Sequence, residues 1–184
     1  MRIVGGSLRG RKLATPKSDA IRPTTDRNRE SLFNILNHTW PDQLRGRVLD
    51  CFAGTGALGL EALSRGAECC VFIEKNAQGL ALINSNIATF GLQDRSKVVR
   101  GNAVNPGPVV DVGPFDLIFA DPPYGQGLGV DAAAALLAHN WVAEGAIFVL
   151  EEKIGFLPDG LEGFEQHDQR SMGDTSIGIF RRAV

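Results

Sequence analysis

The feature that most constrains this chain is the stretch of residues 48–59, which reads VLDCFAGTGALG. An apolar run into Asp50 is typical of a buried strand, and the pattern after the glycines is typical of a helix. Glycine lets the backbone turn tightly and lets its N–H groups approach a ligand, with the N-terminus of a helix behind them. The sequence therefore predicts a strand, a ligand-binding turn and a helix, as at the start of a doubly wound parallel sheet.

The rest of the chain alternates between patterns typical of strands and of helices. Strands are predicted at residues 48–53, 68–74, 97–100, 115–120, 146–151, 164–170 and 175–182, the last two as an antiparallel pair. Helices are predicted at about 27–36 and at 57–65, 76–90 and 131–140, with Asp131 as the cap of the last one. Residues 106–114, which hold three prolines, are predicted to be irregular. This order predicts an α/β fold, a Rossmann-like doubly wound sheet of seven strands with both faces covered.

Charge is divided unevenly along the chain. Residues 1–30 hold eight Lys and Arg against three Asp and Glu, whereas the remainder holds eleven against eighteen, which gives +5 and −7 for a net charge of −2. A basic head on an acidic body is typical of a protein that binds a polyanion, and a solvated arm is the alternative. We therefore expect a basic N-terminal extension over residues 1–40 and a main domain over residues 41–184.

The N-terminal extension combines glycines, small apolar anchors and basic side chains. Residues 1–17 read as a short β-hairpin, followed by a helix that Thr24, Thr25 or Asp26 can cap. Basic side chains on such a hairpin suit contacts to phosphates, which position a nucleic acid without reading its sequence. The candidate RNA contacts are Arg2, Arg9, Arg11, Lys12, Arg27 and Arg29.

Several classes of protein are disfavoured by what the sequence lacks. No run of 18 apolar residues is present to cross a membrane, and the basic N-terminus lacks the apolar segment of a secretory signal. Three cysteines, none in a CxxC pair, favour buried thiols in a reducing cytoplasm over disulfides or zinc ligands. The three histidines also lack metal-ligand spacing, so we expect a cytoplasmic protein with no metal site.

The glycines and two acidic residues indicate the type of cofactor. Gly54, Gly56 and Gly59 match the G-x-G-x-x-G pattern of nucleotide-binding turns. Glu74 ends the next predicted strand, 18 residues after Gly56, where an acid can accept both ribose hydroxyls. Asp50, directly before the turn, would repel a pyrophosphate but suits the amino group and sulfonium of S-adenosylmethionine. The pattern therefore favours S-adenosylmethionine over NAD.

The sequence Asp121-Pro122-Pro123-Tyr124, after another apolar run, indicates the type of reaction. An exocyclic amine on a base is a weak nucleophile because its lone pair is delocalised into the ring. The Asp121 carboxylate and the Pro122 carbonyl can accept its two N–H groups and aim the lone pair, while the prolines fix both acceptors in place. Tyr124 offers a ring on which an unstacked base can lie. The motif therefore predicts methyl transfer to an exocyclic amine.

Together, these motifs resemble those of class I S-adenosylmethionine-dependent methyltransferases of the (D/N)PPY group. The segments MRIVGGSLRGRKL and RPTTDRNRESLFNIL narrow the resemblance to the RsmD family, and the similarity continues to MGDTSIGIF in the last strand. That family methylates N2 of a guanine in 16S ribosomal RNA, on the assembling or assembled small subunit. The resemblance thus implies a cytoplasmic enzyme, expected as a monomer, whose partner is 16S ribosomal RNA or the small subunit and which needs no membrane or metal.

The resemblance also implies roles for individual residues. The implied catalytic residues are Asp121, Pro122, Pro123 and Tyr124. The implied cofactor contacts are Asp50, Phe52, Gly54 and Gly56 for the methionine part, Glu74 and Lys75 near the ribose, Asn102 and Ala103 for the adenine, and Arg22, Thr24 and Thr25 from the arm side. The chain departs from the family at residues 104–114, which are short and broken by prolines where a helix is expected.

Other functions remain open from the sequence alone. The same chemistry suits adenine N6 in DNA or a protein glutamine amide, although the chain has no room for a separate DNA-recognition domain. A non-catalytic RNA-binding assembly factor with a cofactor-shaped pocket is a further alternative, against which the intact residues 121–124 argue. An NAD oxidoreductase lacks a candidate catalytic residue beside the glycine turn.

Overall fold

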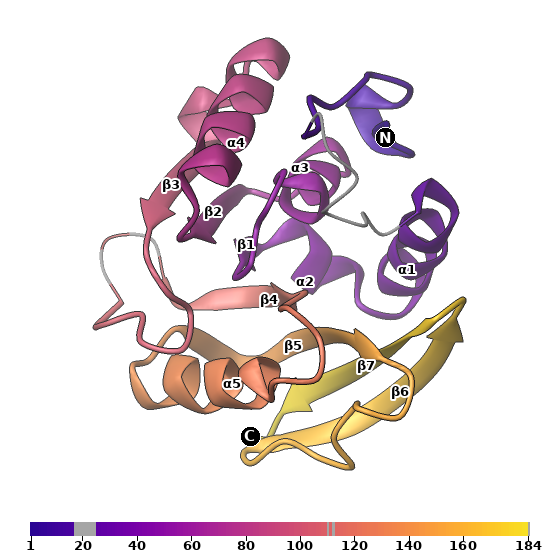
Figure 1. The fold of residues 1–184 in the computed structure, drawn as a ribbon, viewed down its shortest axis with the longest axis vertical. Helices are drawn as coiled ribbons and strands as arrows, with labels where there is room; N and C mark the ends of the chain where they lie inside the picture. The colour runs from indigo at the N-terminus through magenta and orange to yellow at the C-terminus, as the bar shows by residue number, and fades with distance from the viewer. Residues whose placement is uncertain (17–24, 110, 112, 184) are drawn as a thin grey trace.

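Seven strands form one sheet and organise the fold (Figure 1). The computed structural model describes residues 1–16, 25–109, 111 and 113–183. The strands are β1 (Arg47–Asp50), β2 (Cys69–Glu74), β3 (Ser96–Arg100), β4 (Phe115–Ala120), β5 (Val142–Lys153), β6 (Phe164–Met172) and β7 (Thr175–Arg182). Their order across the sheet is β3-β2-β1-β4-β5-β7-β6, and β7 runs antiparallel to both of its neighbours while the other pairings are parallel.

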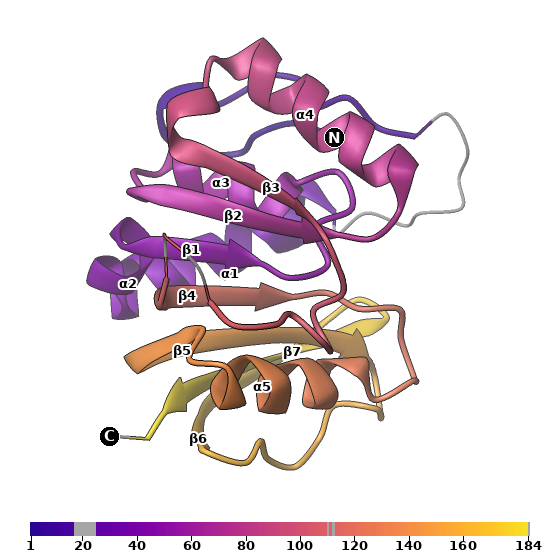
Figure 2. The ribbon, with the colours of Figure 1, turned by 90° about the vertical axis from the view of Figure 1, so that its left-hand side faces the viewer.

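Helices cover both faces of this sheet. The α-helices in the described parts of the chain are α1 (Asp26–Thr39), α2 (Pro41–Arg45), α3 (Ala57–Ser64), α4 (Ala77–Phe90) and α5 (Leu128–Ala138), and the 3₁₀ helices are η1 (Gly6–Leu8) and η2 (Gln93–Arg95). Apolar side chains of α1 to α4 pack on one face and those of α5 on the other. Figures 1 and 2 show α5 opposite α1 and α3. The described helices all lack the length and apolar composition that a membrane span requires.

Successive side chains of the central strands point to opposite faces of the sheet and so contribute to two hydrophobic cores. Val48 of β1 and Leu117 of β4 face the helices α1 to α4, whereas Leu49 and Ile118, the next residues along, face α5. All four side chains are fully buried. A parallel sheet that is covered on both sides requires such continuous apolar strands, which is why the predicted strands read as apolar runs. The prediction of a doubly wound, seven-stranded α/β fold is confirmed.

The strand order places a candidate binding site. From β1 the chain moves outward through β2 to β3, and then returns to place β4 on the other side of β1. Figure 2 shows the arrowheads of β1, β2, β4 and β5 at the same edge of the sheet. Loops that leave adjacent strands in opposite directions open a crevice at this edge, where ligands bind in folds of this type.

Some elements differ from the predictions in their bounds. The last helix begins at Leu128, three residues earlier than predicted, because Gly127 takes a left-handed conformation and caps it. Asp131 is therefore not the cap, since its N–H already donates to the Gly127 carbonyl inside the first turn. Strand β5 starts earlier and ends later than predicted, because it pairs with β4 from Val142 onward and with β7 up to Lys153. Helix α2 was not predicted.

Gly59 generates a test of the packing between α3 and β2. A Cβ atom at this position would lie 2.6 Å from Sγ of Cys70 and would overlap the ring of Phe72. We expect Gly59→Ala to lower the free energy of unfolding by about 1–3 kcal/mol, because overpacking forces the helix away from the sheet. Chemical denaturation would measure the change. Gly160→Ala is the control, since a Cβ there meets no atom within 4 Å, and equal stability of both variants would refute the prediction.

Candidate active site

A cavity of about 420 Å³ lies at the carboxyl ends of the parallel strands. It is bordered by the segments that follow four of them, β1, β2, β3 and β4. The lining residues include Asp50, Phe52, Gly54, Glu74, Lys75, Asn102, Ala103 and all of residues 121–124, together with Met1 and Arg29 from the N-terminal region. The two sequence motifs, 70 residues apart in the chain, therefore open into one space.

The glycine turn, residues 53–56, joins β1 to α3. Gly54 and Gly56 have φ angles of +54° and +77°, which are strained for residues that carry a side chain. Gly56 serves as the N-cap of α3, and its N–H donates to the Ala53 carbonyl over 2.6 Å. The turn thus places the N-terminus of a helix beside the cavity, which Gly54 lines, whereas Gly56, an implied cofactor contact, does not line it.

Asp50, the last residue of β1, is a buried carboxylate at the floor of the cavity. Only 2% of its surface is exposed, and one carboxylate oxygen accepts a hydrogen bond of 3.0 Å from the Gly59 N–H. Burial raises the pKa of Asp50 to about 7; the Gly59 N–H opposes this rise and the charge of Glu74 adds to it. A cationic group in the cavity would stabilise the ionised form of Asp50.

Glu74, the last residue of β2, braces the glycine turn. One carboxylate oxygen accepts from the Gly54 N–H over 2.8 Å, and the other accepts from the Asn76 N–H over 2.7 Å. Both bonds fix the carboxylate at the rim of the cavity, between the loops that follow β1 and β2. An acid held in this way can accept hydroxyl groups from a ligand.

The remaining candidate cofactor contacts lie at different places. Phe52, Lys75, Asn102 and Ala103 line the cavity, with Ala103 buried in the core on the α5 side. The described part of the loop after β3 forms no helix, in line with the departure from the family pattern noted at residues 104–114. Thr25 caps α1, where its hydroxyl accepts from the Asn28 N–H over 3.2 Å, and it is absent from the cavity lining. Arg22 and Thr24 lie outside the described residues.

The DPPY turn, residues 121–124, follows β4 directly. Asp121 is half-buried, Pro122 is buried, and the ring of Tyr124 is 37% exposed beside the cavity. Burial is the main cause that raises the pKa of Asp121 well above its usual value, and the nearby charge of Glu151 adds to it. A hydrogen bond from Tyr124 acts in the opposite direction.

Two acidic residues at the end of β5 support this turn and were missed in the sequence. The Tyr124 hydroxyl donates to Oε1 of Glu151 over 3.1 Å, and the Gly125 N–H donates to Oε1 of Glu152 over 2.9 Å. Both carboxylates are buried. The signal was present in AIFVLEE, because two acids at the end of an apolar parallel strand fall on the ligand-binding edge of the sheet.

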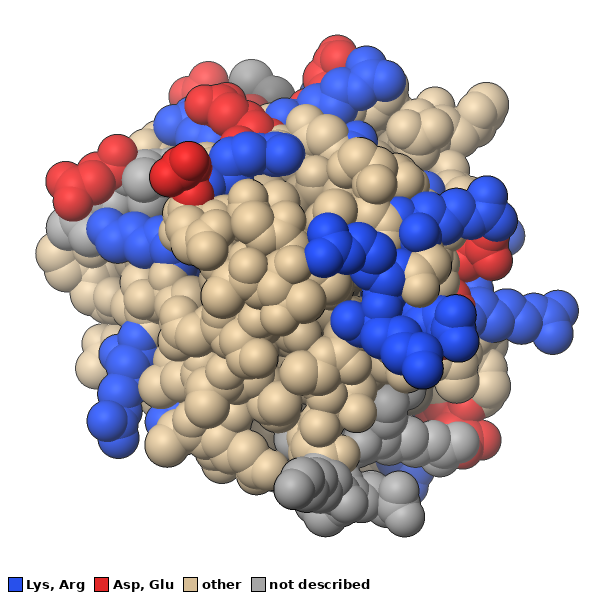
Figure 3. Space-filling model, turned by 90° about the horizontal axis from the view of Figure 1, so that it is seen from above, with Lys and Arg blue, Asp and Glu red and all other residues tan. Residues whose placement is uncertain are grey.

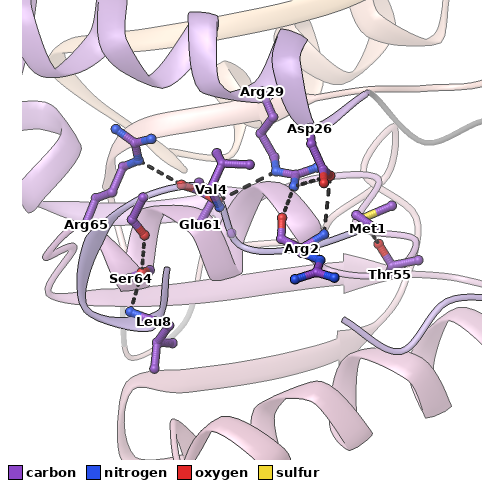
Figure 4. Close-up of polar contacts among 12 residues, drawn as sticks. Met1, Arg2, Val4, Leu8, Asp26, Arg29, Thr55, Glu61, Ser64 and Arg65 are labelled. Carbon is purple, nitrogen blue, oxygen red and sulfur yellow. Dashed lines mark hydrogen bonds and ion pairs between the residues drawn. The ribbon is translucent and has the colours of Figure 1, made fainter. Parts of the chain in front are cut away.

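The N-terminal arm, residues 1–13, packs on α1 and α3 (Figure 4). Its ends pair through a bridge between Arg2 and Lys12, consistent with the predicted hairpin. The Val4 N–H donates to Oε2 of Glu61 over 2.8 Å, and the Leu8 N–H donates to Oγ of Ser64 over 3.0 Å. These contacts carry the start of the chain to the cavity, which Met1 lines.

Arg29 is not a surface cation, contrary to the prediction that it contacts phosphates. Its side chain is fully buried, donates to Oδ1 of Asp26 over 3.0 Å and to the Arg2 carbonyl, and lies 3.7 Å from Glu61. The guanidinium therefore joins α1, the arm and α3 (Figure 4). Residues 29, 32, 33 and 36 share one face of α1, a spacing that is compatible with burial of Arg29 but does not by itself require it.

The other candidate RNA contacts are exposed. They are Arg2, Arg9, Arg11, Lys12 and Arg27. Figure 3 shows Lys and Arg side chains gathered on the right of this view, the side on which Figure 1 places the arm. Arg11 is fixed in part, because it donates to the Thr89 carbonyl over 2.7 Å and lies 4.7 Å from the centre of the Phe90 ring. Among the described residues, no group of three or more His, Cys, Asp or Glu is placed to hold a metal ion.

The contact between β5 and the DPPY turn makes a testable prediction. Glu151→Gln keeps the size of the side chain and an oxygen for Tyr124 but removes a charge near Asp121. We expect the pKa of Asp121 to fall in this variant, because Glu151 contributes to its rise. Carboxyl NMR titration would measure the pKa. Glu144→Gln, at an exposed position near the other end of β5, should leave it unchanged, and an unaltered Asp121 titration in Glu151→Gln would contradict the prediction.

Known proteins resemble this chain over its whole length. Residues 1–181 match the family described as "Conserved hypothetical protein 95". The chain is 37% identical over 184 residues to ribosomal RNA small subunit methyltransferase D of Escherichia coli strain K12, with 99% of this chain and 90% of the relative covered. It is 35% identical over 153 residues to the protein of the same name from Haemophilus influenzae, with 82% and 78% covered.

The fold agrees with these sequence matches. The solved structure of the Escherichia coli protein yhhF superimposes with a TM-score of 0.84 at 35% identity, and covers 99% of this chain and 97% of that chain. The chain therefore belongs to the Conserved hypothetical protein 95 family, the RsmD family, whose fold is that of a class I, Rossmann-like methyltransferase.

Proposed function

We propose that this protein transfers a methyl group from S-adenosylmethionine to the exocyclic N2 of a guanine in 16S ribosomal RNA of the small subunit. The observation that carries the proposal is the shared cavity into which both the glycine turn and the DPPY turn open. A methyl donor held at the first turn would face an amine held at the second, which supplies proximity and orientation. The relatives named ribosomal RNA small subunit methyltransferase D support the ribosomal substrate.

The residues present fit S-adenosylmethionine. Asp50 is a buried carboxylate in the cavity wall, and a cationic ligand would relieve the unfavourable burial that raises its pKa. Glu74 would accept the ribose hydroxyls, and Asn102 and Ala103 would border the adenine, as the family resemblance implies. When bound, S-adenosylmethionine supplies a methyl group on a positively charged sulfur, which departs as a neutral thioether when the amine nitrogen forms its new bond to carbon.

The DPPY turn would hold the amine. The Asp121 carboxylate and the Pro122 carbonyl accept its two N–H groups, so the nitrogen lone pair points into the cavity. Tyr124 provides a stacking surface for the base, and its bond to Glu151 fixes the ring. The nitrogen loses its extra proton after methyl transfer, when it has become acidic, so no strong base is assigned.

The exposed basic side chains of the arm and of the start of α1 would bind the RNA backbone. Arg2, Arg9, Arg11, Lys12 and Arg27 would position the RNA through phosphate contacts, whereas Arg29 holds the arm in place. On this proposal, residues 1–40 serve as an RNA-binding extension and residues 41–184 as the catalytic domain. The packing of the arm on α3, directly after the glycine turn, would bring the bound RNA to the cavity.

Transfer of a tritiated methyl group tests the proposal directly. The substrates are small subunits that lack methylation, the naked 16S RNA and duplex DNA, each followed by nucleoside analysis. Label in N2-methylguanosine from the ribosomal substrates supports the proposal. Label in N6-methyladenine from the DNA would instead identify a DNA methyltransferase. Binding of RNA without any binding of S-adenosylmethionine, measured by calorimetry, would instead identify a non-catalytic assembly factor.

Asp121→Ala tests the role of the DPPY turn. We expect methyl transfer to fall by at least ~100-fold, because one of the two acceptors that aim the amine is lost. Cofactor affinity, measured by calorimetry, should change by less than about threefold, since Asp121 is assigned to the substrate amine. Asp131→Ala is the control, at an exposed position in the first turn of α5. Normal turnover in Asp121→Ala would rule out this mechanism.

The raised pKa of Asp50 predicts how cofactor binding depends on pH. The free carboxyl titrates at about 7, and only its ionised form attracts a cation. Affinity for S-adenosylmethionine should therefore increase as the pH rises from 6 to 7.5, by up to about tenfold per unit below pH 7, with proton release on binding. Calorimetry in buffers of different ionisation enthalpy measures both effects. Asp50→Asn should bind weakly and lose the pH dependence; if it kept the same profile, another group would be responsible.

A further inference from the structure

An exposed aromatic ring lies beside the DPPY turn but outside the cavity. The large apolar side chains that are exposed in the described parts of the chain are Tyr124, Val130, Ile154 and Phe156. Phe156, in the loop that follows β5, is 55% exposed, the highest value of the four. Burial of such a ring is favourable, so a ligand that covers it next to the DPPY turn would gain binding free energy.

The ring of Phe156 has a defined position. It packs on Gly125, where a Cβ atom would lie 3.5 Å from Cε1 of the ring. The loop itself is held by hydrogen bonds from the Phe156 N–H to the Lys153 carbonyl, 3.0 Å, and from the Ile154 N–H to the Asp174 carbonyl, 3.2 Å. Phe156 does not line the cavity. Its ring is therefore available to the part of a ligand that lies next to the group bound in the cavity.

The chemistry of the ring favours a nucleobase. Any RNA strand that delivers one base to Tyr124 carries its neighbouring bases to the rim of the cavity. A base drawn out of a stack also leaves those neighbours without a stacking partner. An exposed, uncharged aromatic ring replaces that partner without reading the sequence, because every base has a π-face.

We propose that Phe156 is a stacking platform for the base adjacent to the target guanine. The inference rests on the proposed function, because it requires an RNA strand at the DPPY turn. Tyr124, which precedes Gly125 in the chain, and Phe156, which packs on Gly125, then separate the target base from its neighbour. Phe156 thereby selects RNA whose target lies in a single-stranded or unpaired segment, where adjacent bases can be splayed apart.

Phe156→Ala tests the stacking. We expect KM for the RNA substrate to rise by ~10-fold, within the range found for the loss of one stacked base, while kcat changes little. Affinity for S-adenosylmethionine and the thermal unfolding midpoint should stay as in the unaltered protein, because the ring is exposed and lies outside the cavity. Ile154→Ala is the matched control, since it shortens an exposed apolar side chain in the same loop.

Two further variants separate aromatic stacking from other contacts. Phe156→Leu keeps an apolar side chain without a ring and should behave like Phe156→Ala. Phe156→Trp should restore KM, and its indole fluorescence should be quenched when RNA binds, because a stacked base quenches indole. A normal KM in Phe156→Leu, together with unquenched Trp fluorescence in Phe156→Trp, would overturn the stacking assignment. These results would instead support the docking of a protein surface on Phe156.

The outcomes distinguish the inference from the proposed function. If the unaltered protein methylates the RNA and Phe156→Ala has an unchanged KM, the stacking platform is wrong and the proposed function stands. If the unaltered protein methylates no RNA, the proposed function fails, and the platform loses its premise with it. If Phe156→Ala and Ile154→Ala raise KM equally, the loop contributes shape and not stacking, which also overturns the inference.

Discussion

The parallel pairing of β1 with β4 is the contact on which the candidate active site depends. Asp50 is paired with Phe119, so the two strands end at nearly the same level, and the residues after each strand enter the same space. Neither motif could act without this register, because each supplies only one wall of the cavity. The apolar residues of both strands hold the register from both faces of the sheet, where a shift by one residue would exchange the two cores.

The site gathers several carboxylates within one edge of the sheet, against their mutual repulsion. Asp50 and Glu74 are held by backbone N–H groups of the α3 region and the glycine turn, and Glu152 is held by the N–H of Gly125. At Asp50, the bond from the Gly59 N–H favours the charged form, whereas burial and the charge of Glu74 oppose it, and the net effect is a raised pKa. The electrostatic energy of these clustered carboxylates is unfavourable by itself and becomes favourable when a cationic ligand binds. The cluster therefore lowers the stability of the free protein and raises its affinity for such a ligand.

The arm is connected to the site by a buried charge cluster. Glu61 of α3 is fully buried and accepts from the Val4 N–H and from Arg65, with Arg29 3.7 Å away. A buried carboxylate is tolerated only when such partners surround it, and the loss of one partner leaves an uncompensated charge. The cluster therefore specifies where the arm lies, and the same helix begins at the glycine turn. The proposed RNA contacts on the arm and the proposed cofactor contacts at the turn thus share one support.

The sequence by itself determined the order of strands and helices, the glycine turn and the DPPY turn, because apolar periodicity, glycine spacing and proline stiffness act over a few neighbouring residues. The doubly wound fold that it predicted is also one in which turns after adjacent parallel strands meet at one edge of the sheet. Only the tertiary structure decided that Arg29 is buried under the arm, that Thr25 is the one of the candidate residues that caps α1, and that Glu151 and Glu152 support residues 27 positions earlier. These features depend on which distant side chains meet, and the same local pattern of an arginine or a glutamate fits either a surface or an interior. Burial and partnership are properties of the packed molecule, so they emerge only when the sheet and helices close around them.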